Sequence, residues 1–428
     1  MLSLQTKLKQ KTIMAMKLKN FTWLLAGLLL VGCSSDDDNN AADESGKTVD
    51  GTKVESVLGL TEEQQAMVAP LNDFSVKLFQ QLSATSGSHS AVMSPLSTAF
   101  VLGMLNEGAT GQTGSEISAA LGLQGKDKES VNRLFAQYIA AIPSVDEQTT
   151  VAFANNVTVN QRYSLKDSYK KAVEGSYDAS VFSLDFSTPD ATKAVNSWCS
   201  QHSRGLIPSI TDQLDDNDVL CLLNAIYFKA LWADKFEKTA TLVFSAPTEK
   251  LFLNAMGRTG SMLYCEQNGL QAVRLPLAKG AYAMTVVLPQ ADQQFSDFVR
   301  SLSARQLSGL TFSEQQVEAS IPIFTTTADN DLITLLKSIG VKRMFDKDAE
   351  LTEMTKEQLY VTEMKQKTRL GIDENGCEGA AVTLAELQQG SSFGEKTKVE
   401  FKATRPFVYF VSEVQSGTIL FMGQFCGD

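Results

Sequence analysis

The stretch Leu223-Asn224-Ala225-Ile226-Tyr227-Phe228-Lys229-Ala230-Leu231-Trp232 is the most informative part of this sequence. Together with the residues just before it, it forms a run from Val219 to Lys229 that is rich in β-branched, aliphatic and aromatic side chains. Such residues favour the pleated surface of a sheet. We therefore predict a strand here, with Asn224 as its polar interruption.

Helical and strand-like patterns divide the rest of the chain unevenly. Apolar residues recur at helical spacing mainly in the first part, and strand-forming residues dominate the later part. The helical segments are 66–82, 96–105, 131–139, 165–176 and 329–339. The further strand segments are 151–159, 271–277, 282–288, 317–325, 399–403, 407–414 and 418–425. Helices followed by strands predict an α+β fold in which much of the sheet is antiparallel.

Length, composition and net charge limit the kinds of protein that this chain can be. The chain has 428 residues, 43% of them apolar and 20% charged, so it can bury a sizeable core. From about Thr61 to Asp428 there is no linker-like break and no internal repeat, which predicts a single domain at 61–428. A formal net charge of −11 argues against a nucleic-acid partner, because such binding relies on Lys and Arg contacts with phosphates.

No catalytic constellation is recognisable. The two histidines are His89, in a Ser/Gly-rich loop composition, and His202, at the end of a helical pattern, so neither is a convincing base. Nucleophile-elbow, metalloprotease, P-loop and dinucleotide-binding motifs are missing. The cysteines have long, irregular spacings without C-x-x-C, which indicates neither a zinc site nor a redox motif. We expect no enzyme, no cofactor and no metal.

The N-terminus has the pattern of a bacterial lipoprotein signal. Lysines precede the apolar run Phe21–Val31, which ends at Gly32-Cys33. A charged region, a run too short to span a bilayer and a small-residue cleavage site predict a signal peptide at 1–32. The Cys33 that follows resembles a lipobox cysteine and is the expected lipidation site. A plain secretory signal is the alternative.

Residues 33–60 are polar and lack apolar periodicity, so we predict a flexible acidic tether that spans on the order of 30 Å. Its Asp-Asp-Asp triplet resembles a surface-export signal of some Gram-negative lipoproteins, and plain solubilising charge explains it equally well. The expected location is the outer membrane or cell surface of a Gram-negative bacterium, and a periplasm-facing anchor stays open. Met16 is an alternative start to Met1, because it places the lysines in a more ordinary signal peptide.

Several segments resemble the serpin family. The segment 223–232 is close to the family's strand 3A motif and is the most specific single match. The other matches, in family order, are Ser90–Ser97 with Leu102–Thr113, Val195–Trp198 with Gly205–Ile207, Ser320–Pro322, Phe401–Phe407 and Ile419–Gly423. The resemblance implies three β-sheets, eight or nine helices and an exposed reactive loop about 30 residues before the C-terminal strands.

The resemblance also implies a mechanism and a partner. A target endopeptidase cleaves the reactive loop, and the freed segment inserts into the large sheet and carries the covalently acylated protease with it. Serine endopeptidases are the expected targets, with papain-like cysteine endopeptidases as a second class, and the inhibitor is expected to be a monomer. The alternative is a non-inhibitory serpin that acts as a surface binding protein.

The hinge of this loop falls on 373–387. By resemblance its residues are Glu374, Gly376, Cys377, Gly379, Ala380, Ala381 and Thr383. Side chains alternate along a strand, so the odd-numbered residues from 377 to 385 share one face, and all of them are small. A small face lets a new central strand enter a packed sheet without overpacking. The alternative is an ordinary amphipathic helix over 378–389, because its residues are good helix formers.

Family spacing from Glu374 places the reactive-site bond at Gly390-Ser391, with Gln388 and Gln389 as alternatives. No Lys or Arg occurs from 375 to 395, which disfavours a trypsin-like target because its charged S1 pocket would stay unpaired.

Under the large sheet, the resemblance assigns Ser94, Ser97, Asn224 and Gln366 to a polar shutter cluster, and Trp232 to the breach where the loop enters. Gln366 replaces the family's usual His, and it can donate and accept hydrogen bonds but cannot change charge with pH. Ile323 stands where a Lys often pairs with the hinge Glu, a loss expected to matter little.

Overall fold

The computed structural model describes residues 58–205, 207–377 and 398–428, which all belong to one compact unit of the chain. Several predicted features therefore lie outside the described residues: the signal peptide, Cys33, most of the tether, the hinge residues Gly379, Ala380, Ala381 and Thr383, and the bond candidates Gln388, Gln389, Gly390 and Ser391. In the part of the chain that is described, no helix has the length and apolar character needed to cross a membrane.

The α-helices are α2 (Glu62–Gln65), α3 (Val68–Ser86), α4 (Pro95–Gly108), α5 (Gly111–Ala120), α6 (Lys128–Ala141), α7 (Asp167–Tyr177), α8 (Pro189–His202), α9 (Phe295–Ser301), α10 (Ala304–Ser308) and α11 (Leu332–Ser338). The strands are β1 (Ala91–Met93), β2 (Thr149–Asn160), β3 (Ala179–Leu184), β4 (Leu220–Leu231), β5 (Glu237–Ser245), β6 (Lys250–Gln267), β7 (Leu270–Leu277), β8 (Tyr282–Pro289), β9 (Ser313–Pro322), β10 (Phe324–Asp331), β11 (Glu363–Ile372), β12 (Gly376–Cys377), β13 (Val399–Lys402), β14 (Phe407–Glu413) and β15 (Ile419–Phe425).

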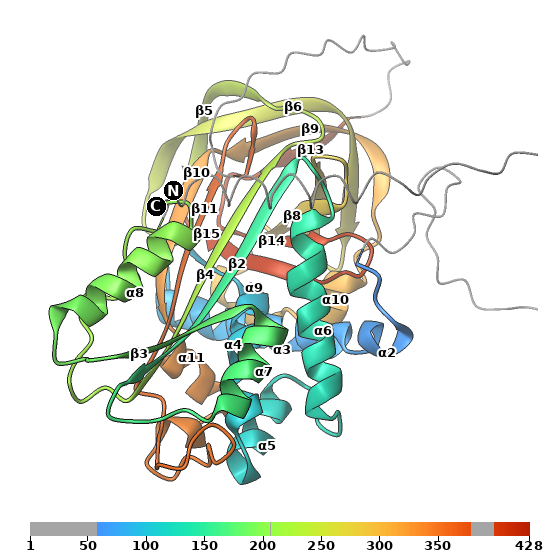
Figure 1. Cartoon of the computed structure of the whole chain (residues 1–428). Coiled ribbons are helices and arrows are strands. Elements are labelled where there is room, and N and C mark those ends of the chain that lie inside the picture. Colours follow the sequence, from blue (N-terminus) through green and yellow to red (C-terminus); the bar gives the residue numbers. More distant parts are fainter. Residues whose placement is uncertain (1–57, 206, 378–397) are drawn as a thin grey trace, which may run out of the picture. The chain divides into compact units, whose positions relative to one another are not determined.

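The six-stranded sheet has the order β10-β11-β12-β4-β2-β3, and β11 also pairs directly with β4 (Figure 1). The β2–β3 and β11–β4 pairs are parallel, and the other pairs in this sheet are antiparallel. The strand predicted at 219–229 is β4, which has neighbours on both sides, so all of the stretch 223–232 except Trp232 lies inside this sheet.

The nine-stranded sheet has the order β1-β15-β14-β8-β7-β6-β9-β13, with β5 attached to β6. The resemblance implies three sheets, whereas hydrogen bonding joins the described strands into two. The reason is β6, which is 18 residues long and pairs with β5, β7 and β9 along different parts of its length. One long strand thus merges two expected sheets, and the α+β class is unchanged.

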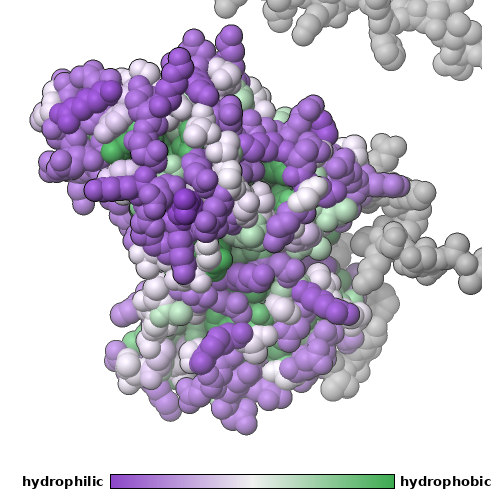
Figure 2. Space-filling view, turned by 90° about the horizontal axis from the view of Figure 1, so that it is seen from below, coloured by the Kyte–Doolittle hydropathy of each residue, from purple (hydrophilic) through white to green (hydrophobic). Residues whose placement is uncertain are grey.

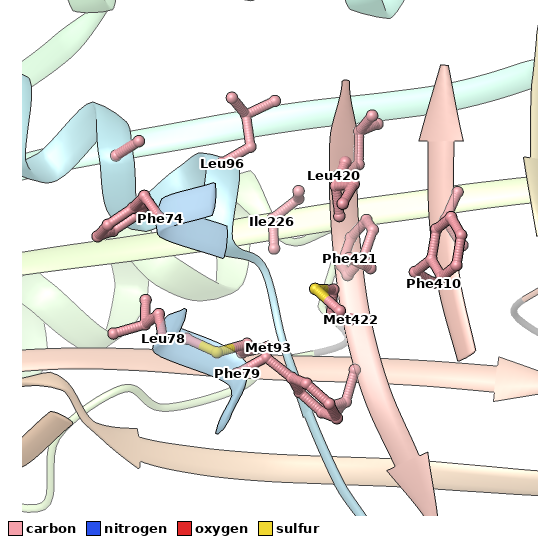
Figure 3. Packing of buried hydrophobic residues seen from close by; sticks show 14 of the residues in the cluster. Phe74, Leu78, Phe79, Met93, Leu96, Ile226, Phe410, Leu420, Phe421 and Met422 are labelled. Carbon is pink, nitrogen blue, oxygen red and sulfur yellow. The ribbon is translucent and has the colours of Figure 1, made fainter. Parts of the chain in front are cut away.

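The main core lies where α3 and α4 meet the strands of both sheets. Figure 3 shows Phe74 and Leu78 of α3 and Leu96 of α4 in the same buried cluster as Ile226 of β4 and Phe421 of β15. Each of these side chains is at most 3% exposed. Truncating a side chain of this kind to Ala costs about 2–5 kcal/mol, because the surrounding core relaxes only partly around the cavity.

A smaller apolar cluster joins α8 to the opposite face of the six-stranded sheet. Val195 and Trp198 of α8 pack with Cys221 and Leu223 of β4, whereas Ile226 belongs to the main core. Odd and even residues of a strand face opposite sides, so α8 covers the face that points away from α4. In Figure 1, α8 lies alongside the long strands β2 and β4.

Two segment boundaries differ from the prediction. The segment 317–325 holds the ends of two strands, because β9 ends at Pro322, which has no N–H to donate, and β10 joins the other sheet. The helix predicted at 329–339 begins at Leu332, because 329–331 pair with β11 and Asp331 caps the helix by accepting from Ile333 N. The strands β3, β5, β6 and β11 were not predicted; in β6 the exposed Phe252 and the successive buried residues 255–257 break the alternation expected of a strand.

The face of the molecule drawn in Figure 2 is mostly hydrophilic. Apolar residues appear on this face only as small, separate areas. Elsewhere among the described residues, Phe252 of β6 is 75% exposed and lies opposite Val243 of β5, which is 46% exposed. Two neighbouring exposed apolar side chains form only a small patch, which is ordinary on a protein surface.

Candidate functional site: the seam between β4 and β11

The line along which β4 meets β11, called the seam below, is closed at one end and open at the other. At the closed end, Glu363–Lys367 of β11 pair in parallel with Cys221–Ala225 of β4. At the open end, β12 lies between the two strands, and its Cys377 is opposite Ala230 on one side and Ile372 on the other. The first residues of the predicted hinge therefore already occupy a strand position in the middle of the large sheet.

A tight turn brings β12 into this position. The carboxylate of Asp373 accepts hydrogen bonds from the backbone N–H groups of Asn375 (2.8 Å) and Gly376 (3.1 Å), as turn-forming Asp residues do. The indole N–H of Trp232 donates to the Asp373 carbonyl at 2.7 Å, and the backbone N–H of Trp232 donates to the Asn375 carbonyl. The predicted breach residue thus holds the hinge turn through both its side chain and its backbone.

Gly376 is required by close backbone approach. A Cβ atom there would lie 2.1 Å from the carbonyl oxygen of Ala230 and 2.7 Å from the Cα of Leu231, so a larger residue cannot occupy this position without moving the strand. The next residue, Cys377, is buried. Burial and then the charge of Asp373 raise the pKa of its thiol, which makes it a poor nucleophile.

Glu374 has a partner that the sequence did not reveal. Its carboxylate lies 3.3 Å from Lys238 Nζ of β5, so the partner lost at Ile323 is supplied from another strand. The Glu374 side chain is 21% exposed and that of Lys238 71%. An ion pair this open to solvent contributes at most about 1 kcal/mol to stability, so it holds the hinge only weakly.

Gln366 replaces the family's usual His with a complete set of hydrogen bonds. Its Oε1 accepts from Ser94 N (2.9 Å) and Thr368 Oγ1 (3.2 Å), and its Nε2 donates to Ser94 O (2.8 Å) and Thr98 Oγ1 (3.2 Å). Ser94 caps α4, and its hydroxyl donates to Leu420 O at 2.7 Å. This half of the shutter joins β11 to the start of α4.

Asn224 forms the other half of the shutter. Its Nδ2 donates to Asn155 Oδ1 (2.9 Å) and Ala154 O (3.3 Å), both on β2. Asn224 is the direct register partner of Gln366 across the seam, yet no hydrogen bond joins these two described side chains. Asn224 Oδ1 and Ser97 Oγ are buried without a hydrogen-bond partner. The polar cluster is therefore divided along the seam.

Several contributors were missed by sequence reasoning. They are Thr98, Thr368, Asn155 and Lys238. Thr98 follows Ser94 by one helical turn, and this spacing is the one sequence signal that could have identified a member of the cluster. The two histidines are engaged elsewhere: His89 with Asp428 at 2.7 Å, and His202 with the backbone oxygen of Trp198 at 2.8 Å.

The chain was also compared with known protein families, curated proteins and solved structures. The family model for serpins, described as serine protease inhibitors, matches residues 69–427. The chain belongs to the serpin family. Members of this family are protease inhibitors rather than enzymes, although some serpins do not inhibit.

Curated relatives match along nearly their whole length. An uncharacterised serpin-like protein of Thermococcus kodakarensis is 28% identical and is covered to 98%, against 94% of this chain. Serpin B11 of Mus musculus is 29% identical, with 97% of it and 82% of this chain covered. Neuroserpin of Mus musculus is 28% identical, with 90% of it and 83% of this chain covered.

Solved structures confirm the fold. The native state of Tengpin, a thermophilic serpin, superimposes with a TM-score of 0.77 at 22% identity, over 90% of this chain and 96% of Tengpin. Human thyroxine-binding globulin complexed with thyroxine gives a TM-score of 0.77 at 22% identity, over 85% of this chain and 98% of the globulin. The fold is thus shared with a thermophilic serpin in its native state and with a protein that was solved in complex with thyroxine.

Proposed function

We propose that this serpin is a suicide inhibitor of endopeptidases, in which cleavage of the reactive loop is followed by insertion of the loop along the seam. The proposal rests on β12: both of its residues already pair with β4, and Cys377 also pairs with Ile372 of β11, so the entry point for a new strand is formed. Extending a strand that is already seated avoids the cost of nucleating a new one between two paired strands.

The register of β12 predicts the whole path of insertion. Cys377 lies opposite Ala230 and Ile372, so each later loop residue would oppose one earlier residue in β4 and one in β11. By this rule Ala381 would meet Ile226 of β4 and Thr368 of β11. Cys377 is buried, and 379, 381 and 383 would share its face, which is where the sequence places Gly, Ala and Thr. The small face of the loop therefore corresponds to the packed face of the sheet.

The shutter supports the same path. By the same rule, Thr383 would lie between Asn224 and Gln366, on the face where these two side chains lie. A Thr hydroxyl both donates and accepts, so it can satisfy the Asn224 Oδ1 that is unpartnered in this structure. An unsatisfied buried acceptor costs about 1–3 kcal/mol, and insertion would remove that cost.

The loop sequence narrows the target class, because the absence of Lys and Arg from 375 to 395 disfavours trypsin-like enzymes. The partner would be a non-trypsin-like endopeptidase of the serine class or, second, of the papain-like cysteine class, bound as a covalent acyl complex at Gly390-Ser391 or within two residues of it. The alternative is a non-inhibitory serpin that binds ligands at the cell surface. That alternative predicts cleavage without trapping.

The experiment is incubation of the intact chain with a panel of chymotrypsin-like, elastase-like, subtilisin-like and papain-like enzymes. An SDS-resistant adduct, together with a released C-terminal peptide whose mass places the cleaved bond, is the expected result. Each protease inactivated beforehand at its catalytic nucleophile serves as the control and should give no adduct. Cleavage throughout the panel without any adduct would favour the non-inhibitory alternative.

We also propose that Cys33 carries a lipid that anchors the protein to the outer membrane or cell surface, with 33–60 as the tether. Cys33→Ala should move the protein from the detergent phase to the aqueous phase in phase partitioning, because the acyl chains supply the apolar anchor. Ser34→Ala, one residue further on, is the matched control and should stay in the detergent phase. If Cys33→Ala stays in the detergent phase as the wild type does, Cys33 does not carry the anchor.

A further inference from the structure

Three side chains with metal-ligating atoms converge at the closed end of the seam. They are Asp218 in the turn before β4, Cys221 on β4 and Glu363 on β11, and their ligand atoms all lie within 4.8 Å of one another. Cys221 and Glu363 are direct register partners across the seam. We propose that these three residues bind a divalent cation of the Zn²⁺ type, and that the bound ion ties β4 to β11.

The neighbours of the site orient its carboxylates. Glu363 Oε1 accepts from Thr211 Oγ1 at 3.1 Å and from Lys365 Nζ at 2.6 Å. The other oxygen, Oε2, is buried without a hydrogen-bond partner, and the whole Glu363 side chain is only 13% exposed. Asp218 Oδ2 accepts from Asp215 N at 2.8 Å. Such outer contacts fix ligand orientation at metal sites, and here they leave one buried carboxylate oxygen for an ion.

The donor set selects the kind of ion. One thiolate and two carboxylates suit Zn²⁺, which binds sulfur and oxygen ligands together and can take water in a fourth position. Mg²⁺ and Ca²⁺ prefer oxygen ligands alone, so a buried cysteine argues against them. Burial, then the charges of Glu363 and Asp218 and a hydrogen bond to the Glu363 carboxylate, raise the pKa of the Cys221 thiol. Binding of the ion must therefore displace the thiol proton and replace this hydrogen bond.

No sequence motif indicates this site, because its ligands are far apart in the chain. Cys221 and Glu363 are brought together only by the parallel pairing of β4 with β11. The spacing of cysteines alone therefore cannot detect a site that uses one cysteine and a partner from another strand.

The consequence of binding rests on the proposed function. The register of β12 places Glu386 of the inserted loop between Cys221 and Glu363. Adjacent strands are roughly 4.8 Å apart, so an inserted strand would separate these two ligands by about one further strand spacing. A single ion with bonds of about 2 Å cannot bind both residues at that separation. The ion therefore binds only the unexpanded sheet and opposes completion of insertion.

The binding test uses the full chain after removal of metal by a chelator. Titration with Zn²⁺ should show one site per chain, and Co²⁺ should give a thiolate-to-cobalt charge-transfer absorption. Cys221→Ala should abolish that absorption, and Asp218→Asn and Glu363→Gln should weaken Zn²⁺ binding at least about tenfold. Cys199→Ala, which removes the other thiol of the cluster beneath α8, is the matched control and should bind normally.

The test remains decisive if one variant folds poorly. Asp218 is partly exposed, so Asp218→Asn keeps the shape of a surface turn and reports on the site even if Cys221→Ala is unstable. No saturable Zn²⁺ binding by the wild type, or unchanged affinity in Asp218→Asn and Glu363→Gln, would overturn the site.

A second measurement separates the ion's role from the proposed function. Zn²⁺ should raise the unfolding temperature of the intact chain and leave that of the loop-cleaved chain unchanged. With any protease that forms an adduct, Zn²⁺ should raise the stoichiometry of inhibition of the wild type and not that of Glu363→Gln. If Zn²⁺ binds and stabilises the intact and the cleaved chain equally, the ion does not oppose insertion, and this part of the proposal is wrong. Complete absence of adducts would overturn the inhibitor proposal, while the titration and the melting comparison would still decide the metal site.

Discussion

The pair β14–β15 and the pair β4–β11 show two ways of building a central strand pair in one molecule. The strands β14 and β15 are buried at every residue and pair along almost their whole length, and β14 pairs equally with β8 on its other side. The strands β4 and β11 pair over five residues only and then diverge around β12. The first pair has no place for another strand, whereas the second already holds the start of one.

The glycines of the two regions also distinguish a closed strand pair from one that admits a new strand. A Cβ at Gly423 of β15 would meet the ring of Tyr409 at 2.3 Å and the carbonyl oxygen of Ala91 at 2.8 Å. A Cβ at Gly376 of β12 would meet the backbone of β4 instead. Both positions need glycine for close approach, but Gly423 serves a permanent core and Gly376 serves the entry of a strand.

The largest expected effect is on the stability of the cleaved chain. Cleavage within Leu387–Phe393 should raise the unfolding temperature by at least about 10 °C, because the inserted strand adds ladder hydrogen bonds and buried area along the whole seam. Calorimetry of intact and cleaved protein measures the difference. A clip within residues 33–57, in the predicted tether, is the control and should leave the unfolding temperature unchanged. If the loop-cleaved and intact forms unfold at the same temperature, the loop does not insert along the seam. The seam then does not differ from the β14–β15 pair as described.

The second effect is on the partition between trapping and release. Ala381→Arg would place a charge on the packed face of the seam without a partner, which costs several kcal/mol and slows insertion. The variant should fold normally and still be cut, and its stoichiometry of inhibition should rise steeply as the protease escapes before trapping. Thr397→Arg, beyond the predicted scissile bond and outside the inserted strand, is the matched control. An unchanged stoichiometry for Ala381→Arg would refute the hinge register.

The third effect compares the two glycines directly. Gly423→Ala should lower the free energy of unfolding by about 1–3 kcal/mol through overpacking against the buried Tyr409. Gly376→Ala should leave the nine-stranded sheet intact, while β12 is displaced and adduct formation falls. Gly260→Ala, on β6, is the control because the nearest atom to its Cβ is 3.6 Å away. Equal effects of Gly423→Ala and Gly376→Ala on adduct formation would mean that the two regions do not differ as described.

Much of the fold was predictable because its strands are continuous apolar runs. The strands at 151–159, 219–229 and 407–414 and the helices starting near Ala66 and Leu96 are confirmed with small shifts of their ends. The strands β5 and β6 were missed because their polar and apolar residues do not alternate regularly: Val243 and Phe252 are exposed, and 255–257 are buried in succession.

The site was predictable only by resemblance. The Ala- and Glu-rich loop reads locally as a helix, and nothing in its own sequence indicates that it can become a strand. Residues such as Lys238 and Asn155 act through partners more than 60 positions away in the chain, and only the fold brings them together. Sequence patterns of this kind report local structure and not distant pairing.

The smallest effect concerns the shutter and depends on pH. Gln366→His restores the residue that serpins usually carry, and a neutral imidazole can still accept from Ser94 N with one ring nitrogen and donate with the other. A protonated imidazole has no acceptor, so the buried position favours the neutral ring and lowers its pKa below the usual value of about 6.5. The unfolded chain then binds more protons than the folded chain below about pH 6.5, and the variant loses stability as the pH falls through that region.

Wild-type Gln366 cannot titrate, so the difference in unfolding temperature between Gln366→His and wild type should be small at about pH 8 and should widen toward about pH 5.5. Gln366→Ala is the control: it loses the same hydrogen bonds at every pH, and its deficit relative to wild type should stay constant. At low pH the loss of stability in Gln366→His should also ease insertion of the loop. The reason is that weaker attachment of β11 to α4 loosens one side of the seam, while the β14–β15 pair is unaffected. A deficit for Gln366→His that does not change with pH would show that the imidazole has turned out of the cluster, and that the hydrogen bonds of Gln366 to Ser94 do not hold this side of the seam.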